Sequence, residues 1–134
     1  MKPIEKILTL MTLILIMSNI SVNAQNEEII NNGKMALKTG SSKELSRYFN
    51  DIVELSIAGE KSSYNKSHAE IVLKDFFKKY PPVDFQYIHQ GSSKEGLKYA
   101  IGKYSYTGGS FRVYILIKQF KGNYFIDTLE FSKE

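Results

Sequence analysis

Residues 98–133 read KYAIGKYSYTGGSFRVYILIKQFKGNYFIDTLEFSK, and apolar and polar side chains alternate through most of this stretch. A period of two residues is typical of a β-strand with one buried face. Gly108-Gly109 and Gly122-Asn123 are turn signals of β-hairpins. The same alternation begins at Val83, and a third turn signal covers residues 92–96. The sequence therefore predicts four antiparallel strands between Val83 and the C-terminus.

Two-residue turns at the two glycine-containing dipeptides fix the register of the last three strands. Tyr104 is then expected to pair with Val113, and Leu116 with Leu129. One face carries small side chains that leave room for a helix, so we expect helices to cover it. This covered face is predicted to hold Ala100, Gly102, Tyr104, Phe111, Val113, Ile115, Ile117, Ile126 and Thr128.

The opposite face mixes apolar side chains with charges such as Lys103, Lys118 and Asp127. It is too apolar for a purely solvated surface, because monomers seldom expose apolar patches beyond roughly a few hundred Å². We therefore predict that this face binds a second copy of the chain or another protein. The residues expected at this interface are Tyr99, Ile101, Arg112, Tyr114, Leu116, Leu129 and Phe131.

A candidate ligand pocket lies on the covered face. If Glu95-Gly96 is the centre of the third turn, His89 lies opposite Gly102 and Tyr87 lies opposite Tyr104. A three-residue turn would reverse that assignment. The first register predicts a pocket for a small apolar ligand beneath the helices. Its expected lining is His89, Tyr87, Tyr104, Phe85 and Gly102.

His89 is the group in this pocket that exchanges a proton near neutral pH, since an unperturbed histidine has a pKa of about 6.5. It is interpreted either as an acid, base or hydrogen-bond donor to a ligand, or as a core or rim histidine bonded to a backbone carbonyl. Asp75 and Asp127 are predicted to face away from it, so no catalytic residue is assigned. The chain has two histidines and no cysteine. No metal site and no cofactor are predicted.

Helical periodicity precedes the sheet. Residues 26–38 and 66–80 each place apolar side chains on one helical face. Gly40 is placed to end the first of these helices, and Pro81-Pro82 prevent the second from continuing.

A short helix, a strand and a turn are predicted between these two helices. Ser41 and Glu44 form a capping box for the short helix, in which Phe49 is expected to face inward. Residues 51–57 alternate as a strand, and residues 58–63 are expected to form a polar turn. The predicted class is α+β, with two N-terminal helices and one long helix packed on a curved, mainly antiparallel sheet.

The first 24 residues have the composition of a signal peptide. Lys2 and Lys6 provide the basic start, residues 7–17 are apolar, and Val22-Asn23-Ala24 is a small-residue cleavage pattern. The apolar run is shorter than the roughly 20 residues that cross a bilayer. We expect an exported, periplasmic or extracellular protein without a membrane anchor after cleavage, with residues 25–134 as a single domain. The alternative is an uncleaved N-terminal anchor.

The charge pattern argues against a nucleic-acid partner. The formal net charge is +4 and is distributed along the chain, with Arg47 and Arg112 as the two arginines. A nucleic-acid interface needs a clustered basic face. The absence of cysteine also removes disulfides and thiolate chemistry from consideration.

The order of the predicted elements resembles the nuclear transport factor 2-like superfamily, whose curved sheet wraps the long helix into a cone. Short segments also resemble an exported Bacteroidetes family, domain of unknown function 4783. The resemblance spans nearly all of residues 27–131 and implies the cone fold but no activity. The segments that carry it are Arg47-Tyr48-Phe49-Asn50, Leu73-Lys74-Asp75-Phe76-Phe77, residues 88–94, Tyr99-Ala100-Ile101-Gly102 and Phe111-Arg112-Val113-Tyr114-Ile115.

We expect a non-enzymatic binding domain. Its ligand would be a small apolar or amphipathic molecule in the cone, or a protein on the opposite sheet face. The superfamily includes isomerases and dehydratases that use Asp, His and Tyr in the cone, so one alternative is a small-substrate isomerase or lyase using His89. The other is a structural protein that acts by dimerisation.

Overall fold

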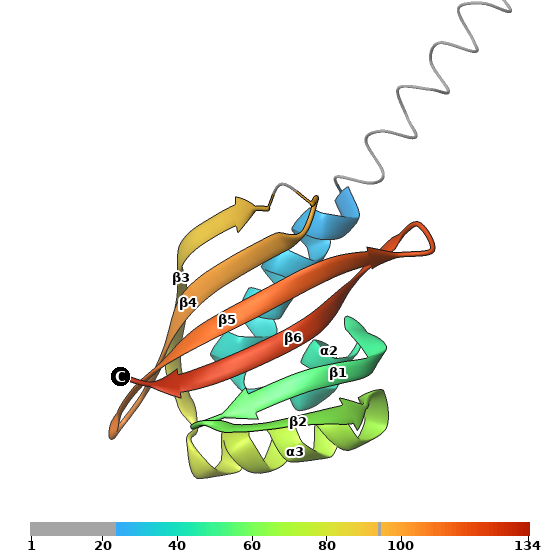
Figure 1. The fold of residues 1–134 in the computed structure, drawn as a ribbon. Coiled ribbons are helices and arrows are strands. Elements are labelled where there is room, and N and C mark those ends of the chain that lie inside the picture. The colour runs from blue at the N-terminus through green and yellow to red at the C-terminus, as the bar shows by residue number, and fades with distance from the viewer. Residues whose placement is uncertain (1–23, 94) are drawn as a thin grey trace, which may run out of the picture.

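A six-stranded sheet, in the spatial order β2-β1-β6-β5-β4-β3, forms one layer of the protein (Figure 1). The computed structural model describes residues 24–93 and 95–134, so the predicted signal peptide lies almost entirely outside the described residues. Neighbouring strands pair antiparallel, except that β1 pairs parallel with β6. The strands are β1 (Phe49–Ile57), β2 (Glu60–Asn65), β3 (Pro82–Ser92), β4 (Lys98–Tyr106), β5 (Gly109–Phe120) and β6 (Asn123–Lys133).

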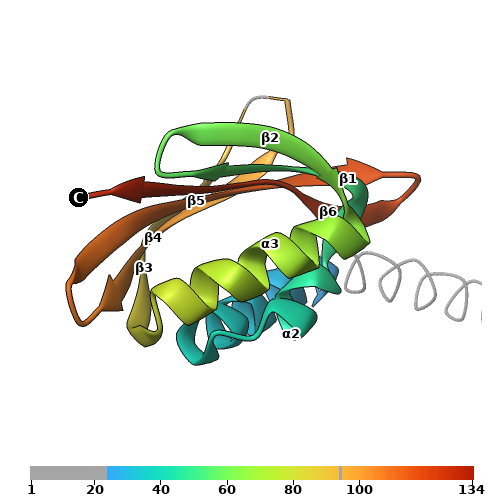
Figure 2. The ribbon, with the colours of Figure 1, turned by 90° about the horizontal axis from the view of Figure 1, so that it is seen from below.

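The helices form a second layer against the inner face of the sheet (Figure 2). They comprise residues 24–39, α2 (Ser42–Ser46) and α3 (Lys66–Lys79). Gly40 follows the first helix with a φ of +72°, the left-handed conformation expected of a helix-terminating glycine. The side chain of Asn65 accepts a hydrogen bond from the backbone N–H of His68 at 2.8 Å and caps α3. The predicted fold class is confirmed.

An aromatic cluster joins the two layers. The Phe76 ring, on α3, has its centroid 4.3 Å from that of Phe131 on β6 and 5.2 Å from that of Phe111 on β5. Tyr104 on β4 adds a third ring at 5.6 Å from Phe76. Buried aromatic pairs in such tilted and edge-to-face arrangements contribute beyond the area that they bury. The helix that carries Phe76 is thereby fixed against three strands.

The strand β2 is missing from the sequence prediction, which has a polar turn over residues 58–63. The turn is shorter, because Ala58 and Gly59 both have positive φ and Ile57 pairs directly with Glu60. β2 is an edge strand whose side chains are mostly exposed, so it lacks the apolar alternation that identifies a strand. The short helix is also shorter than predicted, and Phe49 begins β1 instead.

Both glycine-containing hairpins differ from the predicted register by two residues. Tyr106 pairs with Gly109, and Phe120 pairs with Asn123, so the turns are centred on residues 107–108 and 121–122. Tyr104 therefore lies opposite Phe111 rather than Val113. A shift of two residues leaves every side chain on its predicted face, because the side-chain period of a strand is two. The predicted faces of β4 and β5 are correct for this reason.

A β-bulge in β6 overturns part of the predicted outer face. Ile117 pairs with Ile126 but Leu116 pairs with Thr128, which leaves Asp127 as an extra residue. Beyond this bulge the register shifts by one, and a shift of one exchanges the faces. The predictions that Leu129 and Phe131 lie on the outer face are wrong, since both are fully buried against the helices. Thr128, which was predicted on the covered face, lies on the outer face instead.

Two glycine substitutions test this packing. Gly102→Ala would place its methyl group against Cζ of Phe85, 2.7 Å from Cε2 of the same ring and 2.9 Å from the Gln86 carbonyl oxygen. We expect a loss of about 1–3 kcal/mol in the free energy of unfolding, measured with urea. Gly33→Ala is the matched control, because its methyl meets no atom closer than 3.7 Å. It should stabilise the helix by about 0.5–1 kcal/mol. Equal effects would contradict the packing described.

Candidate functional site

The interior of the cone is filled by its own side chains. Phe85 and Tyr104 are fully buried, and they lie opposite each other on β3 and β4. The space above Gly102 is occupied by the ring of Phe85. The covered-face positions of Tyr87, Tyr104, Phe85 and Gly102 are as predicted. They pack against one another as part of the protein core.

The two tyrosine hydroxyls in the cone bind the protein backbone. Tyr87 Oη donates a hydrogen bond to the carbonyl oxygen of Ile30 at 2.7 Å, and Tyr104 Oη donates to that of Tyr80 at 2.5 Å. These bonds tie β3 to the N-terminal helix and β4 to the end of α3. Burial raises the pKa of both hydroxyls above the ordinary tyrosine value. The two groups therefore have a structural role.

His89 lies outside the cone, contrary to the prediction. Tyr87 pairs with Gly102 and His89 pairs with Ile101, so Ile88 is the extra residue of a second β-bulge. The bulge turns the exposed His89 side chain to the outer face. Its Nε2 atom lies 3.0 Å from Tyr99 Oη. His89 therefore cannot act as an acid, base or hydrogen-bond donor to a ligand inside the cone. The core histidine bonded to a backbone carbonyl is not found either.

The outer strip consists of His89, Tyr99, Ile101, Tyr114 and Leu116, on three adjacent strands. The rings of Tyr99 and Tyr114 are stacked, with centroids 6.4 Å apart and planes inclined by 27°. Ile101 pairs with Tyr114, and Leu116 pairs with Tyr99. None of the described helices lies over the strip, which faces the viewer in Figure 1. It is a continuous, partly exposed apolar and aromatic surface.

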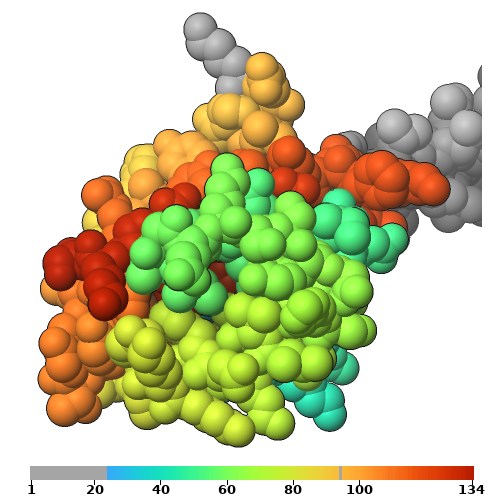
Figure 3. Space-filling view, turned by 60° about the horizontal axis from the view of Figure 1, so that its bottom comes forward, coloured from blue at the N-terminus to red at the C-terminus, as the bar shows by residue number. Residues whose placement is uncertain are grey.

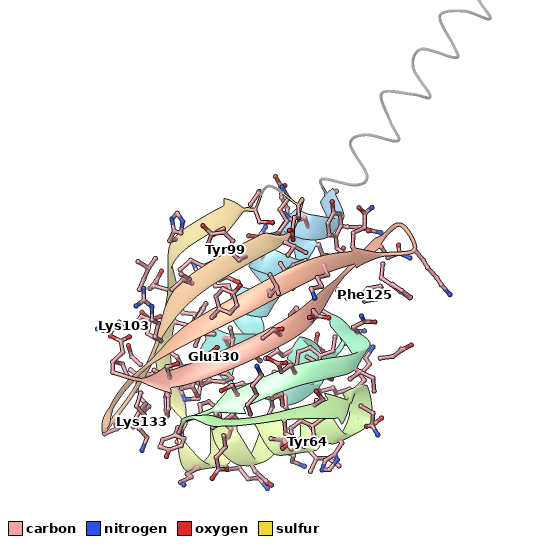
Figure 4. All side chains as sticks on the ribbon, in the orientation of Figure 1. Tyr64, Tyr99, Lys103, Phe125, Glu130 and Lys133 are labelled. Atoms are coloured by element: carbon pink, nitrogen blue, oxygen red, sulfur yellow. The ribbon has the colours of Figure 1, made fainter. Side chains whose placement is uncertain are left out.

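Charges of opposite sign flank the outer strip. Lys103 and Arg112 pair across β4 and β5, and both are exposed. Glu130 lies on β6 opposite Tyr114, and Glu54 lies on β1 opposite Thr128 of β6. Figure 4 shows Tyr99, Lys103 and Glu130 on this face. The face thus has a basic side on β4 and β5 and an acidic side on β6 and β1.

Four of the charges on this face already form two ion pairs. Lys118 Nζ lies 3.2 Å from Asp127 Oδ2, and Lys61 Nζ lies 3.2 Å from Glu54 Oε1. Within residues 24–93 and 95–134, no group of three or more His, Asp or Glu side chains is placed to hold a metal ion.

Residues 30–132 match the family described as Domain of unknown function (DUF4783). The chain belongs to DUF4783. A crystal structure of a DUF4783 protein from Bacteroides ovatus ATCC 8483 is 33% identical, covers 77% of this chain and 93% of that chain, and has a TM-score of 0.72. Another, from Bacteroides uniformis ATCC 8492, is 28% identical over 78% of this chain and 95% of that chain, with a TM-score of 0.73. The resemblance given by the sequence segments is confirmed.

More distant structures share the fold of this DUF4783 chain. An NTF-2-like protein of unknown function from Burkholderia xenovorans LB400 is 15% identical, covers 84% of this chain and 86% of that chain, and has a TM-score of 0.59. A protein with a cystatin-like fold from Nostoc punctiforme PCC 73102 is 8% identical over 84% and 90% of the two chains, with a TM-score of 0.65. No curated protein matches the chain. The cone fold is shown, and it carries no activity with it.

A cavity beside α3 was not among the sites predicted from the sequence. It has a volume of about 320 Å³ and lies between α3, the turn from β1 to β2, and the end of β6 (Figure 3). Its walls depend on β2, the strand that has no apolar alternation.

Among the described residues, no helix is long and apolar enough to cross a membrane.

The buried tyrosines make the free energy of unfolding depend on pH in the alkaline range. Above about pH 10, the ordinary tyrosine pKa, the unfolded chain releases phenolic protons that Tyr87 and Tyr104 retain when folded. The unfolded state then binds fewer protons, so the free energy of unfolding falls as the pH rises. Urea unfolding at several pH values between about 8 and 11 measures this slope. Tyr104→Phe should reduce it, and an unchanged slope in that variant would contradict the assignment.

Proposed function

We propose that this DUF4783 chain is an exported, non-enzymatic protein-binding domain that associates through its outer sheet face. The observation that carries the proposal is the outer strip, an apolar and aromatic surface left uncovered by the described helices. Aromatic residues and arginine are enriched at protein interfaces, and Tyr99, Tyr114 and Arg112 lie together here. Contact with a protein would remove this surface from water.

The filled cone supports this choice over a ligand in the interior. Phe85, Tyr104 and Phe76 occupy the space that a small molecule would need. The alternative of an isomerase or lyase required a histidine in the cone, and His89 lies on the other face of the sheet. Both considerations favour an activity at the surface of the domain.

The charge pattern favours a second copy of this chain as the partner. A two-fold axis along the face, between β5 and β6, would set the basic side of each copy on the acidic side of the other. Arg112 would then approach Glu130 of the other copy, and Tyr114 and Leu116 of the two copies would meet near the axis. An isologous interface of this kind needs a surface that is complementary to itself.

Substitution of Leu116 tests this dimer. Sedimentation velocity of residues 25–134 at micromolar concentrations should give a dimer, and Leu116→Lys should give a monomer. The lysine would place an unpaired charge in the apolar centre of the interface. Ile71→Lys is the matched control, because Ile71 is 59% exposed on α3, away from the outer strip. It should remain dimeric.

Two results would overturn the proposed dimer. The first is a monomeric parent protein at these concentrations. The second is a dimer that Ile71→Lys dissociates and Leu116→Lys leaves intact, which would assign the interface to the helical layer.

Export is tested separately with the full-length chain. When it is expressed in a Gram-negative host, the protein should be found outside the cytoplasm. Its mass should be that of a chain that begins at Gln25. Leu13→Arg should retain the precursor inside, because a charge in the apolar run prevents its recognition as a signal peptide. A full-length product in the cytoplasm of cells that make the unaltered chain would contradict export.

A further inference from the structure

The cavity beside α3 has an apolar floor at the edge of the aromatic core. Ile57, Val72, Phe76 and Tyr80 line it, and its volume is about 320 Å³. Phe76 and Tyr80 are in contact, with ring centroids 5.3 Å apart. The cavity is thus the place where the packed interior of the cone meets solvent. Its size is at the lower end of the range of pockets that hold small ligands.

Four charged side chains surround this floor. Asp75 and Lys79 lie one turn apart on α3, Glu60 comes from β2, and Lys133 comes from the end of β6. An acid four residues before a lysine is well placed for an ion pair along a helix. In the described residues, however, none of these four takes part in an ion pair within 4.0 Å. Two cations and two anions therefore remain available at one rim.

Lys79 is held over the floor itself. Its Nζ atom lies 5.4 Å from the centroid of the Tyr80 ring, within the range of a cation–π contact. This contact places a positive charge next to the aromatic floor, although the Lys79 side chain remains exposed. An anionic group bound on the floor would meet that charge directly.

The turn from β1 to β2 borders the cavity. Ala58 has a φ of +52°, a conformation in which Asn, Asp and Gly are the usual residues. Its side chain borders the cavity, where a larger one would project into the mouth. The backbone N–H of Ala58 donates to the carbonyl oxygen of Phe131 at 2.9 Å, which fixes the turn to β6. Ala58 is thus a small residue at a strained backbone position on the border of the cavity.

We propose that this cavity binds a small zwitterion that carries an apolar group, the chemistry of an apolar α-amino acid. The apolar group would lie on the Val72, Phe76 and Tyr80 floor. The carboxylate would face Lys79 and Lys133, and the ammonium would face Asp75 and Glu60. A ligand with a single charge would leave two rim charges of the other sign without a partner. The site lies on the helical side of the sheet and is independent of the outer strip.

A titration with L-phenylalanine tests the site. In two-dimensional ¹H–¹⁵N spectra of residues 25–134, the ligand at millimolar concentrations should shift the amide signals of Ala58, Asp75 and Lys79. Signals of Tyr99 and Tyr114 on the outer strip should not move. L-phenylalaninamide lacks the carboxylate, and N-acetyl-L-phenylalanine lacks the ammonium. Each analogue should bind about tenfold more weakly, which corresponds to about 1.4 kcal/mol.

Two variants locate the binding on the rim. Lys79→Met should weaken the binding of L-phenylalanine about tenfold. The weaker binding of L-phenylalaninamide, which lacks the carboxylate, should be unchanged. Lys78→Met is the matched control, because Lys78 is exposed on α3 and does not line the cavity. It should bind like the parent protein.

Three results would overturn the proposal. One is the absence of shifts around the cavity at millimolar L-phenylalanine. Another is equal binding of the two singly charged analogues and the zwitterion, which would show that the paired rim charges have no role. The third is an equal loss of affinity in Lys78→Met and Lys79→Met. The analogue series needs only the parent protein, so it decides the question even if a variant fails to fold.

Discussion

The packing of Phe76 against the sheet is the contact on which the rest of the structure depends. A single ring on α3 meets Phe131, Phe111 and Tyr104 from three neighbouring strands. Without cysteine, the domain has no disulfide to hold helix and sheet together. Burial of apolar surface between the two layers must supply most of the stabilisation. Because the same rings fill the cone, the interaction that holds the domain together also closes its interior.

Two single-residue bulges decide what each sheet face presents. The extra residue Ile88 moves His89 from the interior to the outer face, and the extra residue Asp127 moves Leu129 and Phe131 from the outer face to the core. Each bulge reverses the face of every residue beyond it until the strand ends. The outer face therefore has a histidine beside Tyr99 and lacks two apolar residues. Its remaining apolar surface is concentrated on β4 and β5, with acidic groups beyond it.

Because side chains fill the cone, the proposed binding sites lie on the surfaces of the domain. The outer strip and the cavity beside α3 lie on opposite sides of the sheet and present different chemistry. The strip is broad and aromatic, which suits a protein surface. The cavity is small, with opposite charges around an apolar floor, which suits a small molecule. The two proposed sites need no group inside the cone, and the fold alone does not decide between them.

The sequence by itself determined the helices, the four C-terminal strands and the faces of β4 and β5, because hydrophobic period and capping residues are local signals. Errors of two residues in the positions of the turns did not change the predicted faces, since the side-chain direction along a strand repeats every two residues. Only the tertiary structure decided the positions of His89, Leu129 and Phe131, because a bulge depends on the partner strand. It alone also revealed β2 and the cavity that β2 borders. An edge strand of polar residues is defined by hydrogen bonds to β1, and no pattern in its own residues records that pairing.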